Sequence, residues 1–137
     1  MPKTSTERSR ECRARMLDRG DLRSAPNRRK VTTAETLHAQ VVSLYKGKRT
    51  QDITKELYME QWDKHVQQHG YRCAVSGKAF DMQQMSTRPS VDQIIPSAGY
   101  WAGNIRFVTW EINWARGAIP DDRWLELCRG VVGYLQP

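Results

Sequence analysis

The chain has 137 residues, which is enough for one folded domain with an appendage but too few for a larger two-domain enzyme. Its hydrophobic content of 39%, with five Trp and five Tyr residues, excludes a wholly disordered protein. The net charge is +7, and the three cysteines are too scattered for a disulfide framework or for two C-x-x-C zinc knuckles.

The positive charge is concentrated at the N-terminus. Residues 1–30 contain ten Lys or Arg against four Asp or Glu, a net charge of +6, whereas residues 31–137 carry only +1. We therefore divide the chain into a basic arm with a linker (1–30) and a folded segment (31–137). Such an arm suits a polyanion, because each neutralised phosphate releases counterions. A solvated basic tail, or one attracted to an acidic membrane or protein surface, is the alternative.

The arm carries a helix signal and a set of candidate phosphate contacts. Thr4 followed by Glu7 is typical of a capping box, and the stretch up to Arg19 lacks proline. Its apolar stripe is thin, so we expect this helix to be marginal unless it binds a polyanion. The side chains expected to contact phosphates are those of Arg8, Arg10, Arg13, Arg15, Arg28, Arg29 and Lys30.

Two helices are expected at the start of the folded segment, over residues 33–47 with Thr33 as the cap and over residues 50–70. Apolar residues recur at helical spacing in both: Leu37, Val41, Leu44 and Tyr45, then Ile53, Leu57, Tyr58, Trp62 and Val66. His65 and His69 lie near the end of the second helix, where cationic side chains suit the helix dipole. We prefer this interpretation to metal ligation, because no third soft ligand stands at a suitable spacing.

After residue 70 the apolar pattern changes from the helical period to that of strands. Residues 71–75, 90–95 and 105–108 are each typical of a short strand. The segment 97–104 contains two glycines and an asparagine, as expected of a hairpin loop. The sequence therefore predicts an α+β fold in which helices precede a β-hairpin.

Helical periodicity returns after the hairpin. Residues 109–117 are expected to form one helix, and Pro120, followed by two aspartates, opens a closing helix. The side chains expected to be buried on the closing helix are Trp124, Leu125, Leu127, Cys128, Val131 and Val132.

Three polar residues stand out around the hairpin: Asp92 in a strand, Asn104 where the hairpin returns, and Asn113 on the following helix. If that helix packs across the hairpin, Asp92 and Asn113 can offer two oxygen ligands to a hard cation such as Mg²⁺. Asn104 could instead simply close a turn, and Asn113 could cap or pair within its own helix.

Four segments of the sequence resemble successive blocks of the HNH endonuclease family, whose core is a ββα-metal motif. They are CAVSGKAF (73–80), PSVDQIIP (89–96), GYWAGNIRFV (99–108) and INWARG (112–117). The likeness is strongest to small phage-type members and covers less than half of the chain. It implies a ββα-metal core over residues 71–117, with helices before it and the closing helix after it.

Carried onto matching positions, the resemblance implies that Asp92 and Asn113 bind the catalytic metal, Mg²⁺ or another divalent cation such as Mn²⁺. It further implies that Asn104 fixes the hairpin loop by hydrogen bonds and that Arg116 contacts a phosphate. In this family a histidine directly after the aspartate activates the attacking water. That position is Gln93 here.

Gln93 lacks the chemistry of a general base, because a carboxamide does not change its protonation state near neutral pH. General base catalysis contributes about 10²- to 10⁴-fold, so its loss would leave metal-assisted cleavage slow. We weigh three accounts, in order of preference. The natural residue is histidine and was replaced, or the protein binds nucleic acid without cutting it, or Tyr100, His65 or His69 activates water instead.

No structural zinc is expected, because the two C-x-x-C pairs found in many family members are missing. Cys73 stands where one such cysteine would be and is expected to be a small buried hydrophobe. The tryptophans, especially Trp110, Trp114 and Trp124, are expected to pack the helix onto the hairpin in place of the metal. We expect Trp101, in the loop, to pack onto its own domain, with base stacking as the alternative.

The function expected from these features is that of an HNH-type, metal-dependent DNA endonuclease whose activity is impaired by Gln93. The alternative is a DNA-binding or assembly protein that keeps the HNH scaffold without cutting, and RNA is a third possible target. No apolar run approaches the roughly 20 residues that span a bilayer, and no signal segment follows the start. We therefore expect no membrane partner and a cytoplasmic location, in the host cytoplasm for a phage protein.

Overall fold

The computed structural model describes residues 2, 4, 6–8, 11, 31–45 and 52–136. The chain divides into two compact units, Met1–Lys30 and Val31–Pro137. In the first unit the expected capping box is confirmed: the Thr4 amide donates to Glu7 Oε2 at 2.8 Å and the Glu7 amide donates to Thr4 Oγ1 at 3.3 Å. Of the candidate phosphate contacts in the arm, six lie outside the described residues: Arg10, Arg13, Arg15, Arg28, Arg29 and Lys30.

The second unit begins with two helices, α2 (Ala34–Tyr45) and α3 (Lys55–His69). Thr33 caps α2 as expected, because its Oγ1 accepts a hydrogen bond from the Thr36 amide at 3.2 Å. The start of α3 comes later than predicted, since the side chain that accepts from the helix N-terminus belongs to Thr54. Gly70 ends α3 with a φ of 66°, a conformation that favours glycine.

A two-stranded antiparallel sheet follows, formed by β1 (Pro89–Gln93) and β2 (Ile105–Thr109). This is the predicted hairpin, and its register places Asp92 opposite Arg106. The predicted strand over residues 71–75 is wrong: only the isolated bridge between Arg72 and Ala79 forms. The chain turns too early for a strand, because the Gly77 amide donates to the Cys73 carbonyl at 3.0 Å.

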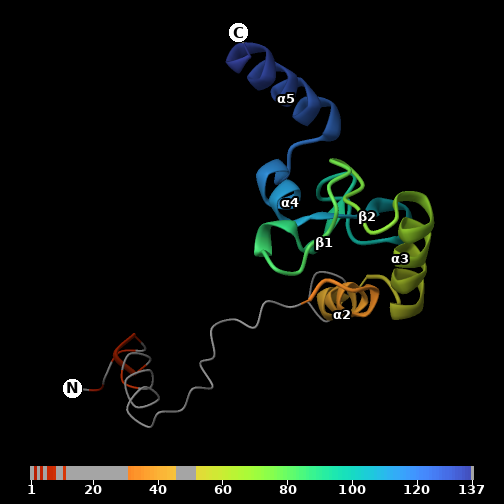
Figure 1. The fold of residues 1–137 in the computed structure, drawn as a ribbon, viewed down its shortest axis with the longest axis vertical. Coiled ribbons are helices and arrows are strands. Elements are labelled where there is room, and N and C mark those ends of the chain that lie inside the picture. Colours follow the sequence, from red (N-terminus) through yellow and green to blue (C-terminus); the bar gives the residue numbers. More distant parts are fainter. Residues whose placement is uncertain are drawn as a thin grey trace. The chain divides into compact units, whose positions relative to one another are not determined.

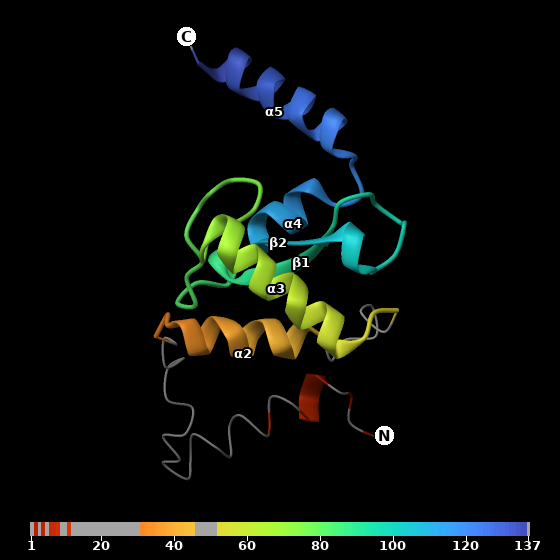
Figure 2. The ribbon, with the colours of Figure 1, turned by 90° about the vertical axis from the view of Figure 1, so that its right-hand side faces the viewer.

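The sheet lies between two helical layers. On one side α2 packs over β1 and α3 over β2, and on the other side α4 (Trp110–Arg116) crosses both strands (Figures 1 and 2). The main core lies between the sheet and the first layer, where Phe107 meets the rings of Tyr58 and Trp62 edge-on at centroid distances of 5.8 and 5.1 Å. The molecule is therefore α+β as predicted, with a hairpin followed by a helix on its outer face.

The closing helix α5 (Asp121–Leu135) forms where it was expected, but it buries none of its residues against the part of the chain that the structure describes. The predicted burial of its apolar side chains is wrong. Leu125, Leu127, Val131 and Val132 are exposed, and α5 runs away from the hairpin after Pro120 (Figure 1). Its first turn holds it to the sheet through Asp121. None of the helices in the described ranges has the length and apolarity to cross a membrane.

Candidate functional site

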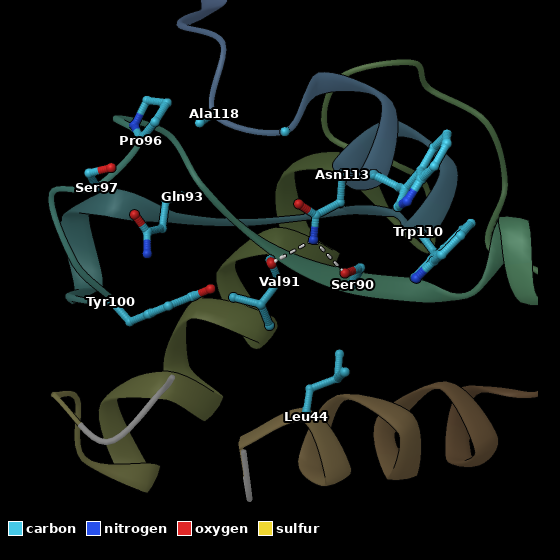
Figure 3. Close-up of a pocket in the computed structure, with 12 residues that line it drawn as sticks. Leu44, Ser90, Val91, Gln93, Pro96, Ser97, Tyr100, Trp110, Asn113 and Ala118 are labelled. Atoms are coloured by element: carbon cyan, nitrogen blue, oxygen red, sulfur yellow. Dashed lines mark hydrogen bonds between the residues drawn. The ribbon is translucent and has the colours of Figure 1, made fainter. Parts of the chain in front are cut away.

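Strand β1 sends the side chains of Asp92 and Gln93 in different directions, because successive residues of a strand alternate between its faces. Asp92 lies on the face that α4 covers, and only 3% of it is exposed. Gln93 is partly exposed and lines a pocket beside the free edge of β1 (Figure 3). The two neighbouring side chains therefore lie in different surroundings.

The Asp92 carboxylate is bound by two arginines. Arg116 Nη1 donates to both of its oxygens, Oδ1 at 2.7 Å and Oδ2 at 2.9 Å, and Arg106 Nε donates to Oδ2 at 2.9 Å. The Arg116 side chain is fully buried and also donates to two backbone carbonyls, that of Gln93 at the end of β1 at 2.9 Å and that of Ile94, the next residue, at 2.8 Å. Arg116 thus anchors α4 to the strand from which Asp92 projects.

Asp121, at the start of α5, completes this ion-pair cluster of Asp92, Arg106, Arg116 and Asp121. Arg106 donates to its two carboxylate oxygens at 2.7 Å each. Arg116 Nε lies 3.0 Å from Asp121 Oδ1, but its N–H is not aimed for a hydrogen bond. Hydrogen bonding from Arg106 lowers the pKa of Asp121, and burial opposes this shift less strongly. For Arg106, burial works to lower the pKa, but hydrogen bonds to Asp121 and Asp92 outweigh it and raise the pKa.

The ion-pair cluster contains two carboxylates and two guanidinium groups, so its formal charges cancel. A divalent cation at Asp92 would have to displace at least one guanidinium and remain next to the other, which is electrostatically unfavourable. The donor set around Asp92 therefore does not fit the metal that the HNH resemblance implies. Arg116 was expected to contact a phosphate, but its buried guanidinium instead donates hydrogen bonds to Asp92 and to two backbone carbonyls.

Asn113, the second candidate metal ligand, has partners of its own. Its Nδ2 donates to Ser90 Oγ at 2.7 Å and to the Val91 carbonyl at 3.0 Å, and Figure 3 shows its side-chain oxygen on the pocket side. Asp92, in contrast, does not line this pocket. The structure brings Asn113 and Gln93 to one cavity, and it leaves the Asp92 carboxylate in the ion-pair cluster.

Asn104 holds the hairpin loop together. The residue is 1% exposed. Its Oδ1 accepts from the Ile95 amide at 2.8 Å, and its Nδ2 donates to the carbonyls of Ile95 at 3.1 Å and Gly99 at 2.8 Å. A buried amide with both of its ends satisfied fixes the loop conformation. This loop contributes Pro96, Ser97 and Tyr100 to the pocket wall.

The pocket, which we call the edge pocket, has a volume of about 580 Å³ and runs along the free edge of β1 (Figure 3). Residues of β1 form its floor, α4 contributes one wall, and Leu44 from the last turn of α2 lies on the other side. The residues lining it are Leu44, Ser90, Val91, Gln93, Pro96, Ser97, Tyr100, Trp110, Asn113, Trp114, Gly117 and Ala118. All of these side chains are uncharged.

The three alternative water-activating residues lie in different places. Tyr100 lines the edge pocket, whereas His65 and His69 line a separate cavity that Gln93 does not reach. His65 is 5% exposed, and burial lowers its pKa to about 4. It is therefore neutral near pH 7, and its Nε2–H donates to the Arg72 carbonyl at 2.8 Å. The interpretation of His65 as a cation at a helix end is wrong, because the ring lies stacked on Trp62 in the core.

The tryptophans of α4 are also placed differently from the prediction. Trp114 is 73% exposed and Trp110 is 40% exposed, and their rings stack on each other at a centroid distance of 5.9 Å and an angle of 14°. Trp114 therefore does not pack the helix onto the hairpin, whereas hydrogen bonds from Asn113 and Arg116 and the partly buried Ile112 hold α4 there. Trp124 lies on α5, which buries no residue.

Two smaller predictions are confirmed. Cys73 is 1% exposed and belongs to the hydrophobic core, as expected of a small buried side chain. Trp101 packs on its own loop, although 49% of it remains exposed: its Nε1 donates to the Ala98 carbonyl at 3.2 Å, and its ring fills the space where a side chain at Gly103 would project.

Sequence reasoning missed Arg106 and Asp121, the two further members of the ion-pair cluster. Arg106 lies directly opposite Asp92 in the hairpin, and an opposite charge on the partner strand is the signal that could have found it. Asp121 gave no comparable signal, since its contact with Arg106 depends on how α5 leaves the fold.

Comparisons of the chain with protein-family models, with curated proteins and with solved structures give no match.

Proposed function

We propose that this protein binds DNA without cutting it, on a scaffold that resembles the HNH core. The observation that carries the proposal is the state of Asp92. Both oxygens of this carboxylate accept hydrogen bonds from arginines, and the residue is 3% exposed. A carboxylate held in this way has little capacity left to ligate a catalytic cation.

The residue next to Asp92 supports the same proposal. Gln93 stands where the HNH pattern has its general base, and a carboxamide neither takes nor gives a proton near neutral pH. The proposed site therefore departs from a nuclease site at two successive positions. Cleavage by metal-activated water would need a carboxylate free to bind the metal at position 92 and a general base at position 93.

DNA is proposed as the partner because of the charge of the arm. Residues 1–30 carry a net charge of +6, whereas the folded segment carries +1. Arginines spaced along such a segment contact phosphates without reading sequence. The affinity of the full chain for duplex DNA should therefore fall steeply with salt, with a slope of about −0.9 in the logarithmic plot for each phosphate contact.

The test combines a binding assay with a cleavage assay on the full chain. Anisotropy of a labelled duplex, measured over a salt series, should show salt-dependent binding. Replacing Arg8, Arg10, Arg13, Arg15, Arg28, Arg29 and Lys30 by alanine should flatten that dependence. The control replaces four exposed basic residues of the folded segment, Lys55, Lys64, Arg123 and Arg129, and the two losses are compared per charge removed. Equal losses in both variants would contradict the role of the arm, and tighter binding to RNA than to DNA would change the partner.

In the cleavage assay, plasmid is incubated with the protein and either Mg²⁺ or Mn²⁺. We expect no nicking, and we expect none from Gln93→His either, because Asp92 stays paired with its arginines in that variant. Metal-dependent nicking by Gln93→His that disappears in Gln93→His with Asp92→Ala would contradict the proposal. It would favour an impaired HNH endonuclease with Mg²⁺ or Mn²⁺ instead.

A further inference from the structure

In the part of the chain that the structure describes, the edge pocket is lined by uncharged side chains. Its described lining contains no Lys, Arg or His that could neutralise a phosphate, and no carboxylate that could hold a cation. What it offers is amide and hydroxyl groups together with aromatic rings. Such a lining suits a flat, uncharged group with hydrogen-bonding edges, and a volume of about 580 Å³ is ample for one.

Asn113 supplies an acceptor that is already oriented. Its amide nitrogen is held by Ser90 Oγ at 2.7 Å and by the Val91 carbonyl at 3.0 Å, which fixes the side chain with its oxygen on the pocket side (Figure 3). Gln93 lies on the opposite side of the cavity and can both donate and accept. A fixed acceptor facing an adaptable amide fits the edge of a nucleobase that carries an exocyclic amine, as adenine and cytosine do.

The rim of the edge pocket carries exposed aromatic surface. Trp110 and Trp114 both line the pocket, and their stacked rings are 40% and 73% exposed. Exposed indole rings beside polar groups are suitable for stacking with bases, since every base has a flat aromatic face. Trp114 contacts Trp110 within the described fold, but 73% of it remains exposed and so accessible to a base.

We infer that the edge pocket binds a single unpaired nucleobase, of the class with an exocyclic amine, between the amides of Gln93 and Asn113. Trp114 stacks on that base or on its neighbour. This inference rests on the proposed DNA binding and deepens it, because the arm would supply general affinity and the pocket a preference for unpaired DNA. Bases inside a duplex present neither a free face nor a free pairing edge, so the base must be unpaired or flipped out.

The experiment uses the full chain and short labelled DNA duplexes at one salt concentration. One duplex is fully paired, a second has one unpaired adenine at its centre, and a third has an abasic unit in place of that adenine. We expect the adenine duplex to bind roughly tenfold more tightly than the abasic duplex. The abasic duplex separates recognition of the base from recognition of a kinked backbone. An unpaired cytosine should behave like adenine, and an unpaired thymine should bind less tightly than either.

Variants assign this preference to the pocket. Gln93→Ala and Trp114→Ala should each bring the ratio of adenine to abasic binding close to one, while their affinity for the paired duplex stays unchanged. Trp124→Ala, on α5, is the matched tryptophan control and should keep the ratio of the unchanged protein. Circular dichroism melting confirms that each variant is folded, and the two pocket variants provide independent tests.

The outcomes separate this inference from the proposed function. Equal binding of the adenine and abasic duplexes by the unchanged protein overturns the nucleobase site, as does a ratio that survives in both pocket variants. Binding of the paired duplex in that case leaves the proposed function standing. Tight binding of the adenine duplex together with metal-dependent cutting would keep the site and overturn the non-cleaving function. A protein that binds none of the duplexes overturns both.

Discussion

Asp92 and Gln93 are neighbours in β1, yet they belong to two contrasting regions. The ion-pair cluster around Asp92 is buried beneath α4, and hydrogen bonds hold its carboxylate to two arginines. The edge pocket around Gln93 is open, and each of the described residues that line it is uncharged. One region pairs the buried charges of Asp92 and Arg116 with the more exposed Arg106 and Asp121, and the other presents polar and aromatic groups to solvent.

This difference shows how one scaffold can separate stability from recognition. Buried charges must be paired, so each member of the ion-pair cluster constrains the others and none is free for a ligand. The polar groups of the edge pocket make fewer hydrogen bonds within the fold, so they can form hydrogen bonds with a partner. Changes in the cluster should therefore alter folding, whereas changes in the pocket should alter binding.

The largest expected effect comes from Arg116→Ala. This change removes a fully buried guanidinium that donates to Asp92 and to the carbonyls of Gln93 and Ile94. Breaking a buried pair from one side costs roughly 3–5 kcal/mol of the free energy of unfolding, which urea denaturation measures. Arg123→Ala, which breaks an exposed ion pair with Glu126, serves as the control and should cost about 0.5 kcal/mol or less. Similar losses in the two variants would contradict the stabilising role of the buried Arg116 in the ion-pair cluster.

A smaller loss is expected for Asp92→Asn, which keeps the shape of the side chain but removes its charge. Weaker hydrogen bonds to Arg116 and Arg106 should lower the free energy of unfolding by roughly 2–3 kcal/mol. Millimolar Mg²⁺ should leave the melting temperature of the unchanged protein within about 1 °C, because a cation that does not bind the native state adds no stability. A clear rise with Mg²⁺ that is absent in Asp92→Asn would show that Asp92 is a metal ligand.

Acid should weaken the ion-pair cluster through Asp121. Hydrogen bonding from Arg106 holds the folded-state pKa of Asp121 below its ordinary value of 3.8. Because the folded-state pKa is the lower one, the ionised carboxylate contributes stability above the ordinary value, and this is lost as the pH falls through the folded-state value. Melting temperatures at about pH 5 and about pH 2.5 should therefore differ less for Asp121→Asn than for the unchanged protein. Asp122→Asn, on the next residue, is the control and should retain the full difference.

The smallest effect on stability is expected for Gln93→Ala. Gln93 is partly exposed and its carboxamide faces the edge pocket (Figure 3), so its loss should change the free energy of unfolding by less than about 0.5 kcal/mol. Thermal melting checks this expectation, and Asn104→Ala provides the contrast, because three hydrogen bonds depend on that buried amide. A loss of stability in Gln93→Ala comparable to that in Asn104→Ala would assign Gln93 a structural role.

The sequence predicted the hairpin and the helices around it because their signals are local. Thr33, Gly70 and Pro120 mark helix ends through capping and backbone geometry, and the turn residues of segment 97–104 mark where β1 ends and β2 begins, although helices bury both faces of these strands. The predicted strand at residues 71–75 failed because a turn replaces regular pairing there. The closing helix was correctly located, but its surroundings were not predictable, since an amphipathic pattern does not specify what covers the apolar face.

For the candidate site, residue types and spacing brought Asp92, Gln93, Asn104 and Asn113 to attention, and all four lie in or around the hairpin and α4. The likeness to a nuclease motif implied that Asp92 and Asn113 share a cation. In the structure they have separate partners. Arg116, about one helical turn after Asn113, donates to Asp92, whereas Asn113 donates to the Val91 carbonyl.

By itself, the sequence determined the α+β order of elements, the basic arm and the polar residues of the hairpin, because these follow from periodicity, capping and composition. Only the tertiary structure decided which of those residues are free to act. Hydrogen-bond partners such as Arg106 and Asp121 come from separate elements, and a buried charge binds whichever opposite charge the packing brings within reach. The same aspartate that resembles a metal ligand in the sequence is therefore part of an ion-pair cluster in the fold.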